Sequence, residues 1–337
     1  MHRGVSPDEL ASRLRDFLAA ASGQGDVMVE HLRRVAGGAS RETWSFDARF
    51  ADGPTRTLIL RRDPGPTNVG TDRALEFRVL RVAHAAGVPV PAVLWLGDDP
   101  AVLEGCFFVM ERIEGETLAR RLLREPRYAA ARRVMPAQLG AILARIHAVP
   151  LDASLDDLPG RRDWEHPATA ELRRYEQLYR VLAPEPHPVI EYGFRWLARR
   201  LPSSRRRVLV HGDFRIGNVM FGPEGVRVVL DWEQAHVGDP MEDLGWMCVR
   251  AWRFGSALPV GGIGERADFF RAYGEASGEP VDPDVVRFWE ALGDLKWAVI
   301  CIAQARTYLD GGVRSVELAS IGRRTAEAEH DLLELVD

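Results

Sequence analysis

Lysine is almost absent from this sequence of 337 residues. Of its 44 basic residues only Lys296 is a lysine, and all the others are arginines. A GC-rich genome accounts for such a bias, but the chemical consequence holds whatever its origin. Any task that proteins usually assign to a lysine must fall here to an arginine, whose guanidinium group is planar and permanently charged.

Cysteines and long apolar stretches are scarce too. The three cysteines, Cys106, Cys248 and Cys301, lie far apart and form no CxxC pair. Their number and spacing offer neither a disulfide framework nor a zinc site, and they favour a reducing compartment. No run of about 18 apolar residues occurs, so we expect no membrane span.

The charge balance and the start of the chain bear on the partners and the location of the protein. The net charge of −5 provides no basic surface, so we expect no nucleic-acid partner. The first 21 residues carry acids early and predict a helix instead of a signal peptide. Ser6 is its expected N-cap, with Pro7 in the first turn and Glu9 completing a capping box. These features predict a soluble, cytoplasmic protein, either a monomer or a homodimer.

The order of predicted elements divides the chain into two parts. Residues typical of β-strands, broken by turns with Gly and Pro, dominate the first part and flank one helical stretch. From about Thr117 onward the apolar spacing is mostly helical. We therefore predict an α+β fold with a small antiparallel-sheet lobe, residues 1–112, and a larger helical lobe, residues 113–337. The absence of a long linker near Met110–Gly115 indicates a hinge beside a cleft.

The segment "VLVHGDFRIGNVMFGPEGVRVVLDW" holds the strongest functional signal. Its second half predicts a β-hairpin that turns at Gly222–Gly225. Such a hairpin places Asn218 just before one strand and Asp231 at the end of the next, so that both can meet Asp213. Phosphoryl transfer requires this set: a carboxylate that orients and deprotonates a hydroxyl, and an amide and a carboxylate that hold Mg²⁺.

These residues resemble the catalytic core of the protein-kinase-like fold, in which His-x-Asp-x4-Asn precedes a strand that ends in Asp. Within that fold, "HGDFRIGN" and "LDWEQAHVGDPMEDLG" resemble the aminoglycoside phosphotransferase and choline kinase-like family of small-molecule kinases. The resemblance runs from about Val29 to the last helix. It implies a two-lobe kinase fold that uses ATP and Mg²⁺, with GTP left open. Asp213 would be the catalytic base, and Asn218 and Asp231 the metal ligands.

The departures from protein kinases are informative. Gly212 stands where those enzymes have Arg, Trp232 and Glu233 replace Phe-Gly, and no long activation segment follows. A protein substrate is disfavoured because the chain then has no platform for an extended peptide. We expect Asp239 and Asp243, like the loop histidine His211, to brace the loop and not to touch substrate.

The N-terminal lobe offers candidates for nucleotide contacts. Gly37, Gly38 and Ser40 lie between two predicted strands and either donate backbone N–H groups to phosphate or form an ordinary hairpin turn. In "TLILRRDP", alternation places Ile59 and Arg61 on one face of a strand and Arg62 on the other. The substitution of Arg62 should therefore lower activity far less than that of Arg61.

The family resemblance assigns roles to several of these positions. Ile59 would cover the adenine, and Arg61 would be the phosphate-binding cation. Glu76, on the following helix, would be the carboxylate partner of Arg61, with an exposed helix glutamate as the alternative. The backbone of Met110, Glu111 and Arg112 would meet the adenine edge.

The acceptor is predicted only as a class. The closing "ELASIGRRTAEAEHDLLELVD" is similar to the kinase domain found fused to acyl-CoA dehydrogenases. An aminoglycoside site should be lined by carboxylates, for which the candidates are Glu233, Glu242, Asp268, Glu290 and Asp294. Five tryptophans, which form the core or line the acceptor site, also lie in this region: Trp232, Trp246, Trp252, Trp289 and Trp297.

We therefore expect a kinase for the hydroxyl group of a small molecule, with hydroxyacyl-type metabolites slightly favoured. An aminoglycoside or other antibiotic kinase is one alternative. A nucleotide-binding pseudokinase is another, and the intact Asp213, Asn218 and Asp231 argue against it.

Overall fold

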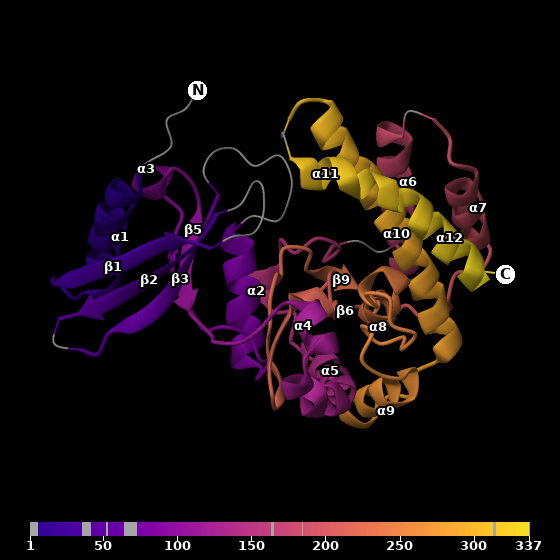
Figure 1. Ribbon diagram of the computed structural model, residues 1–337, viewed down its shortest axis with the longest axis horizontal. Coiled ribbons are helices and arrows are strands. Elements are labelled where there is room, and N and C mark those ends of the chain that lie inside the picture. Colours follow the sequence, from indigo (N-terminus) through magenta and orange to yellow (C-terminus); the bar gives the residue numbers. More distant parts are fainter. Residues whose placement is uncertain are drawn as a thin grey trace. The chain divides into compact units, whose positions relative to one another are not determined.

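The structure is a computed structural model that describes residues 6–35, 42–51, 53–63, 73–162, 165–183, 185–312 and 315–336. The chain divides into two compact units (Figure 1). Unit 1 comprises Met1–Glu114 and Trp232–Gln234, and unit 2 comprises Gly115–Asp231 and Ala235–Asp337. The fold class is α+β, with a small antiparallel sheet and a mostly helical remainder, as predicted.

Unit 1 is built on a five-stranded antiparallel sheet with the strand order β1-β2-β3-β5-β4. The strands are β1 (Val27–Arg34), β2 (Glu42–Phe50), β3 (Arg56–Arg62), β4 (Val93–Gly97) and β5 (Phe107–Glu111). Three helices accompany them: α1 (Pro7–Ser22), α2 (Arg73–Ala85) and α3 (Pro100–Leu103). Ser6 caps α1 by accepting a hydrogen bond from the N–H of Glu9 over 3.3 Å, which confirms the predicted N-cap.

The two longer helices pack on opposite faces of this sheet. Helix α1 contributes a stripe of buried leucines, Leu10, Leu14 and Leu18, to a core that includes Phe107 of β5. Phe108 points to the other face, because side chains alternate along a strand, and its ring lies 6.1 Å from that of Phe77 on α2. The sheet thus presents β3 to α1 on one side and to α2 on the other.

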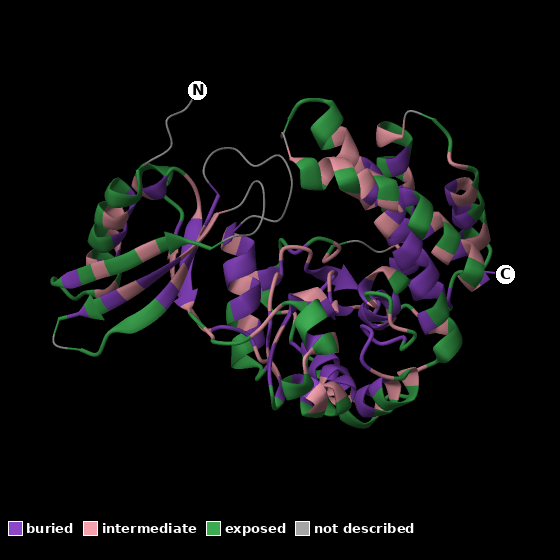
Figure 2. Cartoon of the chain, in the orientation of Figure 1, coloured by how far each residue is buried: buried purple, intermediate pink, exposed green. Residues whose placement is uncertain are grey.

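Unit 2 is organised around α10 (Pro283–Leu309), which is mostly buried (Figure 2). It packs against α6, α7, α8, α11 and α12. The remaining α-helices of the described residues are α4 (Ala119–Arg124), α5 (Ala129–His147), α6 (Pro167–Leu182), α7 (Pro188–Ala198), α8 (Met241–Cys248), α9 (Arg266–Ser277), α11 (Val316–Ile321) and α12 (Thr325–Val336). Short 3-10 turns are η1 (Pro126–Tyr128), η2 (Ala153–Leu155), η3 (Ile216–Asn218), η4 (Arg250–Trp252) and η5 (Gly322–Arg324).

Two short strand pairs in unit 2 position the loop of interest. Strand β6 (Val208–Val210) pairs with β9 (His236–Gly238), and β7 (Val219–Gly222) pairs with β8 (Gly225–Val229). The second pair is the predicted hairpin. Helix α8 approaches α10 closely at Gly245, where a Cβ atom would lie 2.6 Å from the Cβ of Trp289. This approach brings Trp246 of α8 beside Lys296 of α10.

None of the helices in the described ranges combines the length and apolar character needed to cross a membrane.

Candidate active site

A strand and a hairpin carry the residues predicted to be catalytic. Strand β6 leads into the loop from His211 to Arg215, which is followed by η3 and the β7–β8 hairpin. The N–H of Leu230, after β8, donates a hydrogen bond to the carbonyl of Asn218, before β7, over 2.8 Å. The hairpin therefore holds its two ends side by side, as predicted, and Asp231 follows directly.

The carboxylate of Asp213 receives hydrogen bonds from three side chains. The amide nitrogen of Asn218 donates to Oδ2 over 2.6 Å and to the backbone carbonyl of Asp213 over 2.9 Å. The indole N–H of Trp246 donates to Oδ1 over 2.7 Å. The Nε of Arg215 lies 3.1 and 3.2 Å from the two carboxylate oxygens. These contacts fix the direction of both oxygens, which a group that orients a hydroxyl requires.

The donor atoms at the hairpin ends suit a hard cation. Because the amide nitrogen of Asn218 is bonded to Asp213, the amide oxygen is the atom of this side chain that could bind Mg²⁺. Asp231 adopts φ 65°, in the left-handed region that non-glycine residues rarely occupy. Such strained residues cluster at functional sites, where the surrounding structure maintains them. An amide oxygen and a carboxylate are ligands that Mg²⁺ accepts.

Asp243 on α8 fixes the backbone of the loop that precedes Asp213. Its carboxylate accepts hydrogen bonds from the N–H groups of His211, over 2.8 Å, and Gly212, over 2.9 Å. Burial raises the pKa of Asp243, but the hydrogen bond and charge of His147, 3.2 Å away, lower it further, so the net shift is downward. The fully buried carboxylate thus remains ionised and holds the turn before Asp213, which confirms its predicted bracing role.

His211 also has the structural role that the sequence predicts. Its Nε2 donates to the carbonyl of Leu230 over 3.0 Å, and its Nδ1 accepts from the N–H of Asp213 over 3.2 Å. Complete burial lowers the pKa of the imidazole, which is therefore neutral in this tautomer. His211 ties the loop to the strand that leads to Asp231.

Unit 1 contains the predicted ion pair. Arg61 Nη1 lies 2.7 Å from Oε1 of Glu76, and the carboxylate is completely buried. Leu58, Leu60 and Arg62 are buried on one face of β3, whereas Ile59 and Arg61 are partly accessible on the other, so the predicted alternation is confirmed. An exposed helix glutamate, the alternative for Glu76, is wrong.

The pair belongs to a larger buried network that the sequence did not reveal. Arg73, one helical turn before Glu76, contacts the second oxygen of its carboxylate and also lies 2.8 Å from Asp63. Burial lowers the pKa of the Arg73 guanidinium, but the charges of Glu76 and Asp63 raise it further. Two arginines and two carboxylates therefore compensate one another in a region that excludes water.

Arg62 has a stronger role than expected. Its Nε lies 2.6 Å from Oε2 of Glu42, and its guanidinium also reaches the carbonyl of Leu103 over 3.4 Å. Only 3% of the side chain is exposed. The sequence prediction for Arg62 concerned activity and stays a prediction, but the buried ion pair gives the residue a role in stability that the sequence did not reveal.

The structure does not test the other predicted nucleotide contacts. Gly37, Gly38 and Ser40 lie outside the described residues. The N–H of Glu111 donates to Ala92 over 3.0 Å, and that of Arg112 donates to Thr57 over 3.3 Å. An adenine that binds these two N–H groups would have to displace bonds within unit 1. Met110 pairs with Ile59 at the centre of the sheet.

Three residues at the site escaped the sequence analysis as site residues: Arg215, Trp246 and Lys296. Arg215 and Trp246 bond directly to Asp213, and the Nζ of Lys296 donates to the carbonyl of Gly212 over 2.8 Å. Arg215 could have been found from its place in the loop motif. Trp246 and Lys296 lie on distant helices, and only the solitary occurrence of lysine marked Lys296.

A second possible metal site lies close by. Ligand atoms of Glu171, His236 and Glu242 are within 4.8 Å of one another. However, the Lys296 ammonium lies 3.6 Å from Glu242, and His236 Nε2 lies 3.1 Å from the same carboxylate. The ammonium already supplies the positive charge that two buried carboxylates need, and it would repel a divalent ion.

The sequence pattern that defines the phosphotransferase enzyme family (APH) matches residues 31–289. Acyl-CoA dehydrogenase family member 10 of Mus musculus is 32% identical over 329 residues, which cover 93% of this chain and 30% of that protein. Probable acyl-CoA dehydrogenase IBR3 of Arabidopsis thaliana is 28% identical over 325 residues, covering 88% of this chain and 38% of that protein. The chain thus spans about a third of the length of these relatives.

Solved structures share the fold. A Ralstonia eutropha protein assigned as an aminoglycoside phosphotransferase has a TM-score of 0.74 at 23% identity, covering 96% of this chain and 97% of that chain. An aminoglycoside phosphotransferase in complex with AMP-PNP and hygromycin B has a TM-score of 0.63 at 19% identity, with 97% and 98% coverage. A choline/ethanolamine kinase family protein of Mesorhizobium loti has a TM-score of 0.56 at 21% identity, with 97% and 99% coverage. The predicted protein-kinase-like fold is confirmed.

Proposed function

This chain belongs to the phosphotransferase enzyme family, and on that premise we propose that it transfers the γ-phosphoryl group of ATP to a hydroxyl group of a small molecule. The observation that carries the proposal is the arrangement around Asp213. Its carboxylate is bonded to Asn218 and Trp246, and the adjoining hairpin leads from Asn218 to Asp231. One carboxylate oriented for a hydroxyl and two oxygen ligands for Mg²⁺ form the set that phosphoryl transfer requires.

Each group has a defined task in this reaction. Asp213 orients the acceptor hydroxyl and accepts its proton late in the transfer, because the transition state is loose and the nucleophile needs little early deprotonation. The amide oxygen of Asn218 and the carboxylate of Asp231 would hold Mg²⁺, which neutralises charge on the phosphate oxygens when bound. Arg215, beside both oxygens of Asp213, supplies a positive charge where the transferred phosphoryl group arrives.

Unit 1 would bind the nucleotide. Arg61 is the proposed phosphate cation, and its bond to the buried Glu76 fixes the direction of the guanidinium. Since Arg73 bonds the other oxygen of Glu76, that carboxylate stays compensated while Arg61 meets a phosphate. Ile59, on the same strand face, would cover the adenine, and Gly37, Gly38 and Ser40 would offer backbone N–H groups to phosphate oxygens.

A cavity in unit 2 is the proposed site for the body of the acceptor. It has a volume of about 330 Å³ and is lined by Arg250, Ala251, Phe254, Gly255, Trp297, Arg324, Glu327, Ala328 and Asp331. A row of rings connects it with the catalytic loop: Trp246 lies 5.1 Å from Trp252, and Trp252 lies 4.9 Å from Trp297. Trp246 and Trp252 are buried, so of these rings only Trp297 would contact an acceptor bound in the cavity.

The charges of this region support a hydroxyacyl-type acceptor more than a polycation. The cavity lining holds two arginines and two carboxylates, so it has no excess of negative charge. Three acids considered for an aminoglycoside site are buried: Glu242, Glu290 and Asp294. Glu290 is also paired, with Arg253 and Arg266, each over 2.7 Å. Of the five tryptophans considered for the acceptor site, Trp232, Trp246, Trp252 and Trp289 belong to the buried core, and Trp297 lines the cavity. A flexible acyl chain can pack on Trp297 without such acids.

A coupled ADP-release screen tests the proposal. Purified protein with Mg²⁺–ATP would be offered hydroxy acids, hydroxyacyl thioesters, amino alcohols, sugars and aminoglycosides. We expect acceptor-dependent ADP release with at least one hydroxyl compound, and hydroxyacyl compounds to be among the best. Tight Mg²⁺–ATP binding without release for any acceptor would support a pseudokinase, and turnover confined to aminoglycosides would overturn the acceptor assignment.

A further inference from the structure

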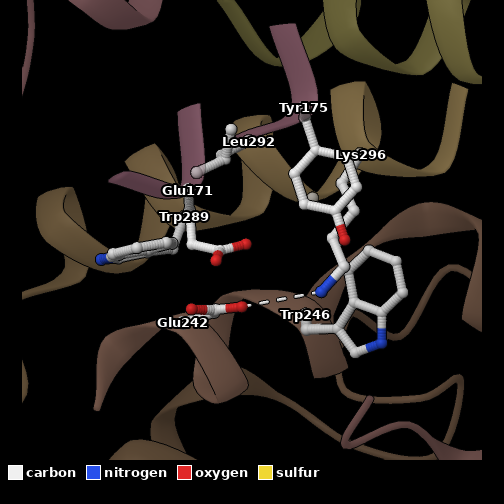
Figure 3. A pocket seen from close by; sticks show the side chains of 8 residues that line it. Glu171, Tyr175, Glu242, Trp246, Trp289, Leu292 and Lys296 are labelled. Carbon is white, nitrogen blue, oxygen red and sulfur yellow. Dashed lines mark ion pairs between the residues drawn. The ribbon is translucent and has the colours of Figure 1, made fainter. Parts of the chain in front are cut away.

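The only lysine of the chain lies directly beneath the catalytic loop. Lys296 belongs to α10, and its side chain is buried among Glu171, Tyr175, Glu242 and Trp246 (Figure 3). In a sequence whose other basic residues are all arginines, this one position carries a different cation. The ammonium group contacts both a backbone carbonyl of the loop and an aromatic ring.

The ammonium contacts the loop on the N-terminal side of Asp213. Its Nζ donates to the carbonyl of Gly212 over 2.8 Å, one residue before the proposed base. Gly212 adopts φ 77°, a left-handed conformation that glycine reaches without the steric penalty of a side chain. Asp243 accepts from the N–H of the same glycine over 2.9 Å. Both backbone polar groups of this turn therefore end on buried charges of opposite sign.

The ammonium also contacts the indole that bonds the base. Nζ lies 4.5 Å from the ring centroid of Trp246, within the range of a cation–π contact. The indole N–H of the same ring donates to Oδ1 of Asp213 over 2.7 Å. Lys296 thus reaches Asp213 by two routes: the peptide that precedes it and the ring that holds its carboxylate.

The shape of the site selects lysine. An ammonium is a compact charge with three donors that point in different directions, whereas a guanidinium is a planar fork. The cavity beside Lys296 has a volume of only about 10 Å³, which is the space of a single water molecule. A guanidinium in this place would have to move Trp246 or the carbonyl of Gly212.

The surrounding charges keep the ammonium ionised. Burial lowers the pKa of Lys296, but the acidic groups of Tyr175, Glu242 and Glu171 raise it above its usual value. The contact with Glu242 is 3.6 Å long (dashed in Figure 3). The positive charge is therefore a fixed part of the site across the working pH range.

We propose that Lys296 and Trp246 are positioning residues for Asp213: the ammonium fixes the Gly212 carbonyl and the Trp246 ring, and the indole N–H fixes the carboxylate. The proposal rests on the proposed function, since positioning has a kinetic effect only if Asp213 takes part in phosphoryl transfer. In this role the single lysine acts through the compact shape of its ammonium group as well as through its charge.

The kinetic test uses three variants and an acceptor from the screen. Lys296→Met removes the charge, Lys296→Arg keeps the charge but not the shape, and Trp246→Phe removes only the N–H donor and part of the ring. We expect Lys296→Met to lower kcat by about 10²-fold, the loss that a misplacement of about 1 Å causes, with the KM for ATP within about twofold of wild type. Lys296→Arg should recover less than a tenth of that loss. Trp246→Phe should lower kcat by about tenfold.

The chain offers a matched control for each change. Trp289 lines the same cavity and is equally buried, but its indole N–H has no hydrogen-bond partner among the residues that the structure describes. Trp289→Phe should therefore leave kcat within about threefold of wild type. Arg306→Met, at the exposed end of the same helix, removes a cation that pairs only with Asp310 over 3.1 Å in the described structure.

A readout without turnover separates this proposal from the proposed function. In a ¹H–¹⁵N spectrum, the indole signal assigned by its loss in Trp246→Phe should shift in Asp213→Asn and in Lys296→Met, but not in Arg306→Met. If Lys296→Met does not fold, the double variant Lys296→Met/Glu242→Gln removes the ammonium together with the charge of the carboxylate 3.6 Å from it, and it serves in its place.

The outcomes decide the proposal. An unchanged Trp246 signal in the folded lysine variant, full recovery of kcat by Lys296→Arg, or equal losses in Trp246→Phe and Trp289→Phe would each overturn it. An indole shift in a protein that phosphorylates no acceptor would instead support the coupling of the three residues and reject the proposed function.

Discussion

Two regions of the molecule bury charge at functional positions, but they do so with different chemistry. In unit 1, the cations Arg61 and Arg73 bond directly to the carboxylates of Glu76 and Asp63. In unit 2, the ammonium of Lys296 bonds to a backbone carbonyl and lies on an aromatic ring, while the nearest carboxylate is 3.6 Å away.

This difference indicates what each cation does. A guanidinium group matches a carboxylate in shape. The arginine network of unit 1 can therefore fix helix α2 to strand β3 through hydrogen-bonded ion pairs. At Gly212 and Trp246 a peptide carbonyl and a ring face offer no such match, and a compact ammonium contacts both. At these two sites the arginines meet carboxylates, and the lysine meets the loop.

The largest effect should follow from removing a charge at the loop of unit 2. Asp231→Ala should abolish measurable turnover and weaken nucleotide binding in the presence of Mg²⁺, because a metal-binding carboxylate is lost. Calorimetry with Mg²⁺–ATP measures the affinity. Glu224→Ala is the control, since that exposed carboxylate lies at the turn of the same hairpin and pairs with Arg227. Unchanged Mg²⁺–ATP affinity in Asp231→Ala would reject the metal assignment.

The corresponding change in unit 1 tests the arginine network. Arg61→Ala should lower kcat/KM by about 10²-fold or more, since a cation aimed at the phosphates is removed. The protein should still fold because Arg73 continues to compensate Glu76. Arg61→Lys should retain more activity than Arg61→Ala, in contrast to the poor exchange expected at Lys296. Arg81→Ala, on the exposed side of α2, provides the control, and a loss there equal to that of Arg61→Ala would remove the special role of Arg61.

Arg62→Ala should separate stability from activity. The change leaves Glu42 without its closest cation, so we expect a loss of about 3 kcal/mol in the free energy of unfolding. Urea denaturation measures this loss, and kcat of the remaining folded enzyme should stay near that of wild type. A folded and stable Arg62→Ala protein with a larger fall in kcat than Arg61→Ala would exchange the roles of the two arginines.

A pH-dependent effect on stability is expected at a buried carboxylate, Asp239, whose charge is poorly compensated. Burial raises the pKa of Asp239 from 3.8 to about 6, and its Oδ1 accepts from the N–H of Met241 over 2.8 Å. Between these two pKa values the folded state binds more protons than the unfolded state, so stability falls as the pH rises from about 4 to about 6. The full cost above that range is about 3 kcal/mol.

Asp239→Asn keeps the oxygen that caps α8 and removes the charge. The variant should therefore be more stable than wild type by up to about 3 kcal/mol at pH 7.5, and by only about 1 kcal/mol at pH 4.5. Urea denaturation at the two pH values measures the difference. A stability gain that does not depend on pH would show that folding does not raise the pKa of this carboxylate.

Local patterns in the sequence predicted the parts of the site that local geometry controls. The hairpin brings Asn218 and Asp231 close because two strands and a Gly-bounded turn leave no other arrangement. Alternation along β3 assigns Arg61 and Arg62 to opposite faces. The pair of Arg61 with Glu76 followed from the family resemblance, and the structure confirms the contact.

The site residues that the sequence did not reveal depend on the packing of helices that are far apart in the sequence. Trp246, on α8, donates to Asp213, which lies 33 residues earlier in the chain, and no spacing in the sequence encodes that contact. Lys296 lies 84 residues from the carbonyl that it holds. Arg73 is one helical turn from Glu76, but an exposed pair and a buried network have the same spacing. Burial of charge was therefore the property least accessible from the sequence.

The most direct test of the proposed mechanism is the replacement of one carboxylate oxygen of Asp213 by an amide nitrogen. Asp213→Asn keeps the shape of the side chain and one acceptor oxygen but removes the charge that takes the hydroxyl proton. With the acceptor from the screen, kcat should fall by roughly 10²–10⁴-fold while the affinity for Mg²⁺–ATP stays near that of wild type. Near-normal kcat of Asp213→Asn on that acceptor would contradict the mechanism proposed for this protein.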